Sequence, residues 1–120
     1  MAVIVVAEDE FLIADMLISF LEDEGHEVFG APHGLGALEV VRERRPTIII
    51  TDFMMPLMTG LELAQAVRAD STLADIPIIL VSGAQGAIGR AHPEFFNVVL
   101  DKPYSLEDLL GTVNRLIGQP

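Results

Sequence analysis

The segment Thr47–Gly60, with the sequence TIIITDFMMPLMTG, joins an apolar run to a turn-forming stretch and decides the fold. Its first four residues are all β-branched, and together with Thr51 they predict a strand that is buried on both faces. Asp52 follows at the end of this strand, where a carboxylate is costly to bury without a partner. The segment therefore predicts an acidic side chain at the exposed edge of a sheet, paired with a cation or a metal.

Strand and helix patterns alternate along the rest of the chain. Apolar runs predict further strands at 3–7, 27–30, 77–81 and 98–100. Between the strands, helical periodicity predicts amphipathic helices. The first of these helices is expected to be capped by Asp9 and to end at Gly25. Its buried face is expected to consist of Ile13, Met16, Leu17, Phe20 and Leu21. This alternation predicts an α/β fold, a doubly wound, five-stranded parallel sheet of flavodoxin-like order 2-1-3-4-5.

The fourth helical segment is the least regular. Ser82–Pro93 contains three glycines and ends in a proline, which predicts a loop with at most a short helix. Elsewhere the pattern shows no internal repeat and no linker, so residues 1–120 are expected to form one domain. Gly118–Pro120 is expected to be a frayed end.

Composition excludes several classes of function. With 7 Lys and Arg against 18 Asp and Glu, the formal net charge is −11, which repels a phosphate backbone and argues against nucleic-acid binding. The longest apolar runs are too short to cross a bilayer, and Met1–Val6 lacks the basic flank and cleavage site of a signal peptide. The chain has no cysteine. A cytoplasmic location is therefore expected, without membrane attachment.

Acidic, hydroxyl and basic residues follow the predicted strands at their carboxyl ends. Glu8 and Asp9 follow the first strand, Asp52 ends the third, Ser82 ends the fourth and Lys102 follows the fifth. Because these strand ends share one edge of a parallel sheet, the side chains are expected to meet there. Clustered carboxylates need a counter-charge, and Mg²⁺ (or Mn²⁺) prefers oxygen ligands. The set predicts a phosphoryl-transfer site with Asp52 as nucleophile.

Four motifs in order carry a family resemblance: Val5–Glu10, Asp52–Gly60, Val81–Gly83 and Lys102–Tyr104. With these motifs, the chain resembles the receiver domain of bacterial two-component response regulators over essentially its whole length. The resemblance implies a phosphoacceptor signalling domain that takes its phosphoryl group from a histidine kinase or a histidine phosphotransfer domain. It implies no enzyme activity beyond self-catalysed phosphoryl transfer and autodephosphorylation.

The resemblance also implies a role for each matching residue. Asp52 accepts the phosphoryl group, Lys102 binds it, and Ser82 is the switch hydroxyl. Asp9 and Asp52 bind the metal directly, Glu8 binds it through water, and Met54 contributes its backbone carbonyl. The Lys102–Pro103 peptide bond is expected to be cis.

Two departures from the family pattern alter the expected switch. Val99 stands where receiver domains usually carry Tyr or Phe, and the segment between Ser82 and Lys102 is shorter and richer in glycine. The output face is therefore expected to be remodelled, with Phe95, Phe96 and Tyr104 as the aromatic residues nearby. Met54 offers no polar side chain to orient an attacking water, which predicts a long-lived phosphoryl group.

Simpler interpretations remain open at this stage. Glu8–Glu10 could serve only to cap a helix, and Asp52 could serve only to cap the turn that follows it. Lys102 could be an ordinary surface charge. His26, His33 and His92 are expected at the surface.

Two other functions share the fold class: a docking module that is never phosphorylated, and a small aspartyl-phosphate phosphatase, which would need a general acid at the position of Met54. The downstream partner is an unidentified protein or a missing output domain, and a homodimer is a further alternative.

Overall fold

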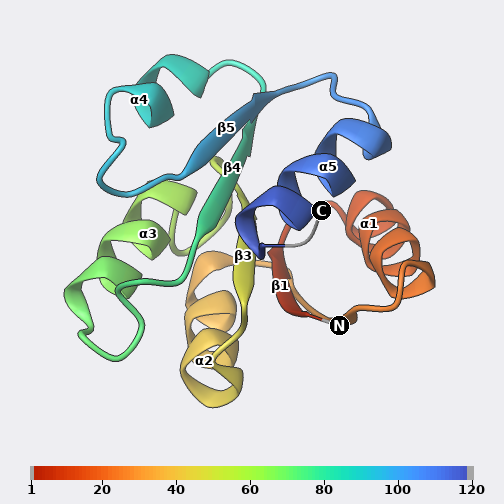
Figure 1. The fold of residues 1–120 in the computed structure, drawn as a ribbon. Coiled ribbons are helices and arrows are strands. Elements are labelled where there is room, and N and C mark those ends of the chain that lie inside the picture. Colours follow the sequence, from red (N-terminus) through yellow and green to blue (C-terminus); the bar gives the residue numbers. More distant parts are fainter. Residues whose placement is uncertain (1, 119–120) are drawn as a thin grey trace.

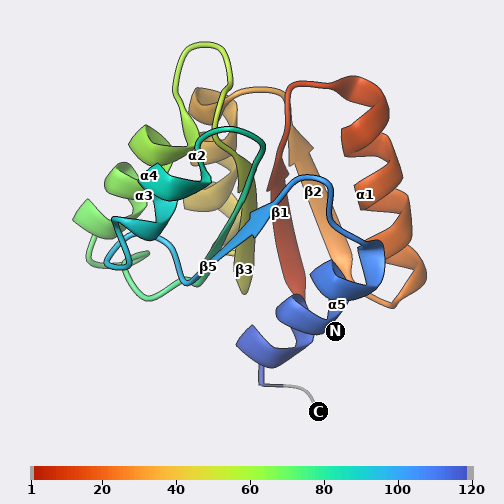
Figure 2. The same ribbon diagram turned by 90° about the horizontal axis from the view of Figure 1, so that it is seen from above.

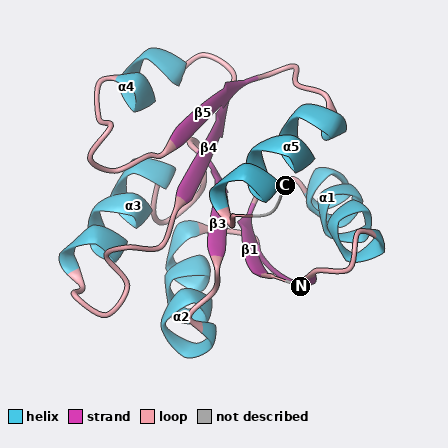
Figure 3. Cartoon of the chain, in the orientation of Figure 1, coloured by secondary structure: helices cyan, strands magenta, loops and turns pink. Residues whose placement is uncertain are grey.

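Residues 2–118 of the computed structural model form one five-stranded sheet and five helices (Figures 1 and 3). In chain order these are β1 Val3–Ala7, α1 Phe11–Asp23, β2 Glu27–Ala31, α2 Gly34–Arg44, β3 Ile48–Asp52, α3 Gly60–Ala69, β4 Ile78–Ser82, α4 Gly86–Arg90, β5 Val98–Asp101 and α5 Leu106–Leu116. All neighbouring strands pair in parallel, in the order β2-β1-β3-β4-β5. The predicted fold class and strand order are confirmed.

The register of the sheet places the polar residues on its last rungs. Asp52 is the final residue of β3 and pairs with Val81, and Ser82 is the final residue of β4 and pairs with Asp101. Asp52 ends its strand as predicted, whereas β2, β4 and β5 each end one residue later than their apolar patterns predicted. The backbone ladder continues to the polar residues, so their positions are fixed by the sheet and not by a loop.

Alternate residues of each strand enter two cores on opposite faces of the sheet. In β1, Val5 faces the core under α2 and α3, whereas Ile4 and Val6 face the core under α1 and α5. Figure 2 shows these helices as two layers with the sheet between them. Burial on both faces explains why the strands read as continuous apolar runs and not as an alternating pattern.

The start of α1 corrects one prediction. Its N-cap residue is Glu10 and not Asp9, and the Glu10 side chain makes no capping hydrogen bond. The Asp9 carboxylate instead lies with those of Glu8 and Asp52. The expected buried face is also too wide, because Met16 is 49% exposed. Gly25 does end the helix as predicted, with a φ of +92° that favours glycine.

The expectation of histidines at the surface is wrong for His26, and His33 is half-buried. His26 is buried, and its Nδ1 accepts a hydrogen bond from the backbone N–H of Ala2 at 3.1 Å. His33 caps α2 by accepting from the N–H of Gly36 at 3.0 Å. Both imidazoles satisfy backbone donors, which spacing along the sequence does not reveal.

The irregular fourth segment is confirmed as a short helix. α4 spans only Gly86–Arg90, and the Lys102–Pro103 bond further along is cis, as the resemblance implied. Gln119 and Pro120 of the expected frayed end lie outside the described residues. Among residues 2–118, no helix combines the length and the apolar character needed to cross a membrane.

Arg68 of α3 ties together three segments at the amino-terminal end of the sheet. Its guanidinium donates to the carbonyls of Ala74 and Ile76 at 2.8 and 2.6 Å, and to the carbonyl of Phe95 and the side chain of Asn97 at 3.0 Å each. Burial lowers the pKa of Arg68, and the nearby Asp75 charge opposes this. The bonds anchor the loop that leads from α4 into β5.

We therefore expect Arg68→Met to destabilise the fold by about 3 kcal/mol, since it leaves several carbonyls without a donor. Urea unfolding followed by circular dichroism measures the change. Arg115→Met, at an exposed position near the end of α5, is the matched control and should change stability by less than about 0.5 kcal/mol. Equal stabilities for the two variants would contradict the anchoring role of Arg68.

Candidate functional site

Three carboxylates meet at the carboxyl ends of β1 and β3. Glu8 and Asp9 follow β1 directly, and Asp52 ends the adjacent strand β3. One oxygen from each lies within 4.8 Å of the others. β1 is also the point at which the strand order reverses, which is where open α/β sheets bind ligands. Three oxygen donors at this spacing fit a hard divalent cation.

The carboxylate of Asp52 is held on both of its oxygens. Oδ1 accepts from the backbone N–H of Phe53 at 2.9 Å, and Oδ2 accepts from Lys102 Nζ at 3.2 Å. The same ammonium lies 3.9 Å from Glu8 Oε1. The Asp52 side chain is 14% exposed, so it remains reachable from solvent while one cation partly neutralises it. The predicted meeting of Glu8, Asp9, Asp52 and Lys102 is thus observed in the geometry.

Burial sets the protonation of Glu8. Its side chain is only 5% exposed, and desolvation, aided by the Asp52 charge, raises its pKa from 4.5 to about 7. A hydrogen bond from the backbone N–H of Glu10 and the charge of Lys102 act in the opposite direction. Without a bound cation Glu8 would therefore be partly neutral near pH 7, whereas a bound cation would favour its ionised form.

This pKa predicts a pH dependence of stability. Between pH 4.5 and about 7 the folded protein holds the Glu8 proton more tightly than the unfolded chain does. The Glu8 contribution to the free energy of unfolding is therefore fully present below that window and is lost as the pH rises through it. We expect the stability of the wild type relative to Glu8→Gln to fall over this range without metal. Urea unfolding at a series of pH values tests this, and a relative stability that rises with pH would contradict it.

Ser82 is fully buried, and its hydroxyl is engaged by Gln85. Ser82 Oγ accepts from the backbone N–H of Gln85 at 3.0 Å, and Gln85 Oε1 lies 3.5 Å from the same oxygen. Ser82 is joined to Lys102 through the backbone, because Lys102 N–H donates to the Ser82 carbonyl at 2.8 Å. The contact of Gln85 with Ser82 was not predicted from the sequence, although Ser-x-x-Gln is a recognisable capping pattern.

The loop after Asp52 is fixed by close packing of Gly60. Gly60 N–H donates to the Phe53 carbonyl at 2.8 Å, and a Cβ on Gly60 would overlap the Asp52 carbonyl oxygen and lie 3.1 Å from the carbonyl carbon. From the other side, the Thr51 hydroxyl donates to the same carbonyl at 2.9 Å. The backbone at Asp52 is therefore held from two directions. Sequence analysis left the role of Gly60 undefined.

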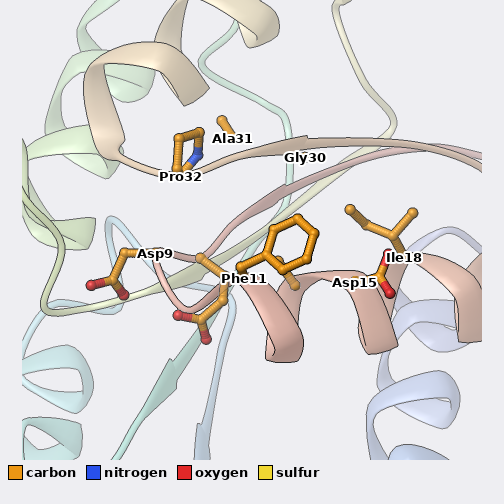
Figure 4. A pocket seen from close by; sticks show the side chains of 9 residues that line it. Asp9, Phe11, Asp15, Ile18, Gly30, Ala31 and Pro32 are labelled. Atoms are coloured by element: carbon orange, nitrogen blue, oxygen red, sulfur yellow. The ribbon is translucent and has the colours of Figure 1, made fainter.

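Apolar side chains border the acidic pocket. Met54 is 58% exposed, so its side chain lies at the surface next to Asp52. A second, mostly apolar pocket of about 350 Å³ adjoins Glu8 and Asp9 between α1 and the end of β2, and Figure 4 shows Phe11, Asp15 and Ile18 on one side with the Gly30–Pro32 segment on the other. Tyr104 lies near Lys102, Ile13 and Met16, and its burial, with the Glu8 and Asp52 charges, raises its pKa. The mouth of the site thus offers apolar contact around a charged centre.

Fold and site together define the class: a doubly wound α/β domain with a carboxylate pocket at its strand-order reversal and a lysine beside it. The chain belongs to the response regulator receiver domain family, whose family model matches residues 4–114. Such domains are signalling modules of two-component systems, and a phosphoacceptor role fits this chain. The docking-module and phosphatase alternatives are not favoured.

Individual relatives cover almost the whole chain. The polar-differentiation response regulator DivK of Brucella anthropi is 28% identical over 117 residues, which is 96% of this chain and 95% of DivK. The structure of chemotaxis response regulator CheY4 of Vibrio cholerae has a TM-score of 0.88 at 32% identity, covering 97% of this chain and 98% of CheY4. The receiver domain of sensor histidine kinase PA1611 of Pseudomonas aeruginosa, solved with a magnesium ion in its active site cleft, has a TM-score of 0.89 at 22% identity, covers 98% of each chain and shares the fold.

Proposed function

We propose that Asp52 is the phosphoacceptor of this receiver domain and that residues 1–120 form one switching unit. The observation that carries the proposal is the position of the Asp52 carboxylate. It lies 3.2 Å from the only lysine of the chain and within 4.8 Å of two further carboxylates. A partly exposed carboxylate between an ammonium and a set of cation ligands is suited to attack a phosphoryl group.

We propose Mg²⁺, with Mn²⁺ as a substitute, as the metal of this pocket. Asp9 and Asp52 would hold it directly, Glu8 through a water molecule, and Met54 through its backbone carbonyl. The donor set is all oxygen and carries an excess of negative charge, which suits a hard divalent cation. When bound, the cation supplies positive charge that neutralises the transferring phosphoryl group.

The transfer itself exchanges one bond to phosphorus for another. A carboxylate oxygen of Asp52 attacks the phosphorus atom and forms an acyl phosphate. The bond between phosphorus and a histidine nitrogen of the donor breaks, and the nitrogen keeps the electron pair. Lys102 stabilises the negative charge on the phosphoryl oxygens, and the Ser82 hydroxyl donates to one of them after the transfer. Autodephosphorylation is hydrolysis of this acyl phosphate, in which water attacks the phosphorus atom with the help of the same residues.

Receiver domains interact with histidine kinases and downstream effectors. For this chain we propose a histidine kinase or a histidine phosphotransfer domain as phosphodonor. Phe11 and Leu12 are 77% and 80% exposed beside the acidic pocket, so they are available for apolar contact with the donor. The excess of acidic over basic residues favours a donor surface with basic side chains at the rim.

The phosphorylated state is proposed to be long-lived. Met54 has an apolar, exposed side chain two residues after the acceptor, so it cannot orient an attacking water by a hydrogen bond. Loss of the phosphoryl group within seconds in the presence of Mg²⁺ would contradict this part of the proposal.

Acetyl phosphate tests the proposed function without a partner protein. Incubation with acetyl phosphate and Mg²⁺ should add the mass of one phosphoryl group to the intact wild-type protein. Asp52→Asn should remain unmodified while keeping its fold, and chelation of the metal should prevent the reaction in the wild type. An equal addition to Asp52→Asn would overturn the assignment of Asp52.

A further inference from the structure

The apolar pocket between α1 and the end of β2 extends away from the proposed phosphoacceptor (Figure 4). Its volume of about 350 Å³ lies at the lower end of the range for small-molecule sites, roughly 300–1,000 Å³. Glu8 and Asp9 form a wall that the pocket shares with the carboxylate cluster. Asp52, Ser82 and Lys102 do not line it. The pocket is therefore a separate compartment beside the proposed metal site.

The shape of the pocket depends on small residues on both of its walls. A Cβ on Gly30 would lie 2.7 Å from Ile18 Cδ1, so the missing side chain on β2 lets Ile18 lie against the strand. Ala14 lies one turn before Ile18 on α1, and Ala31 follows Gly30, so the space beside this contact stays open. The helix and the strand touch at one point and leave a hollow next to it.

Acidic groups without a counter-charge border this apolar space. Asp9 and Asp15 line the pocket, and neither forms an ion pair with any residue in the range 2–118. No Lys, Arg or His is among the residues that the structure places in its wall. The ring of Phe11, a residue that is 77% exposed, adds an aromatic surface at the rim. This lining disfavours an anion and suits a cation that carries an apolar body.

The edge of the sheet adds a backbone acceptor to the same pocket. β2 is the outermost strand and pairs only with β1 among the described strands. Glu27 N–H donates to the Ala2 carbonyl at 2.9 Å, and the Ala31 carbonyl accepts from Glu8 N–H at 3.0 Å. Because the bonding direction alternates along a strand, the backbone groups of Gly30 face away from β1. The Gly30 carbonyl is therefore available to a donor in the pocket.

We propose that this pocket binds a small organic cation, an ammonium or amidinium group on an aromatic or branched aliphatic body. The apolar body would lie against Ala14 and Ile18, and the cationic group would neutralise the carboxylates of the wall and donate to the Gly30 carbonyl. A metal ion that retains its waters gains nothing from apolar walls. The inference goes beyond the proposed function and does not require Asp52 to be the acceptor.

Titration with phenethylamine in the absence of metal tests the proposal, with the methyl groups of Ala14 and Ile18 followed by NMR. Phenethyl alcohol and phenylacetate carry the same ring with a neutral and a negative group. Phenethylamine should shift both methyl signals in a saturable way. The alcohol should bind about 2- to 5-fold more weakly, the size of one exposed charge pair, and phenylacetate should not bind. No shift with phenethylamine, or equal binding of all three probes, would overturn the proposal.

Three variants locate the binding in the pocket. Asp15→Asn should weaken phenethylamine binding about 2- to 5-fold. Asp23→Asn, at the exposed end of the same helix, removes the same charge away from the pocket and should bind as the wild type does. Ala14→Leu fills the space and should abolish amine binding, while circular dichroism and Mg²⁺ binding report that the fold is intact. Equal affinities of Asp15→Asn and Asp23→Asn, or amine binding by folded Ala14→Leu, would contradict the location.

Coupling to the metal provides a second readout. Because Glu8 and Asp9 belong to both compartments, the two cations should oppose each other. Saturation with phenethylamine should weaken Mg²⁺ binding about 5-fold, and Mg²⁺ should weaken amine binding by the same factor. Isothermal titration calorimetry measures both, and independent binding would contradict the shared wall. Asp52→Asn should still bind the amine, so a failure of this inference is distinguishable from a failure of the proposed function.

Discussion

Lys102→Met is expected to slow phosphorylation by acetyl phosphate about 100- to 1,000-fold, the usual cost of removing one preorganised charge-stabilising donor. Lys102 Nζ lies 3.2 Å from the Asp52 carboxylate and 3.9 Å from that of Glu8. Its loss removes positive charge from the place where the phosphoryl oxygens would gather. Stopped-flow or quenched-mass kinetics with Mg²⁺ measure the change.

Mg²⁺ affinity provides an independent readout for the same variant. The ammonium and the divalent cation would neutralise the same carboxylates, so removing Lys102 should leave Mg²⁺ binding unchanged or tighter. Lys102→Arg keeps the charge of the side chain but not its shape, so its phosphorylation rate should lie between those of the wild type and Lys102→Met. A Lys102→Met protein that reacts at the wild-type rate would show that the ammonium has no part in the transfer.

Gly60→Ala is expected to destabilise the fold by about 1–3 kcal/mol and to displace the acceptor, because the new Cβ overlaps backbone. The atoms that it meets are the Asp52 carbonyl oxygen and carbon and, at 3.2 Å, Phe53 Cα. None of these belongs to a flexible side chain. The backbone that carries Asp52 must shift, and the phosphorylation rate should fall together with the stability.

Gly111→Ala is the matched control for this substitution. Gly111 lies in α5, and a Cβ there meets nothing within 4 Å. Alanine should stabilise this helix by up to about 1 kcal/mol and leave phosphorylation unchanged. Thermal or urea unfolding and intact-mass kinetics compare the two variants; equal stability of both would contradict the close packing assigned to Gly60.

The fold could be predicted from the sequence because its signals are local and repeated. Each strand is an apolar run, and each helix except the short α4 carries its own apolar stripe. The strand ends were harder, since a polar last residue such as Ser82 or Asp101 looks like the start of a loop. Only the backbone ladder between neighbouring strands shows that these residues still belong to the sheet.

The candidate site could be predicted as a set of residues but not as a network. Parallel strands made the meeting of Asp9, Asp52 and Lys102 foreseeable from their order alone. Asp9 was also assigned as a helix cap, because a cap and a metal ligand have the same local sequence. The Gln85 contact and the Gly60 packing depend on loop conformation and on distances across the fold, which residue spacing does not report.

Borohydride trapping tests the central claim most directly. The wild-type protein is phosphorylated with acetyl phosphate and Mg²⁺, reduced with borohydride, which converts an aspartyl phosphate to homoserine, and then digested for peptide mass spectrometry. The account predicts homoserine at position 52 and at no other aspartate. Homoserine at Asp9 or Asp101 with an unmodified Asp52 would contradict it.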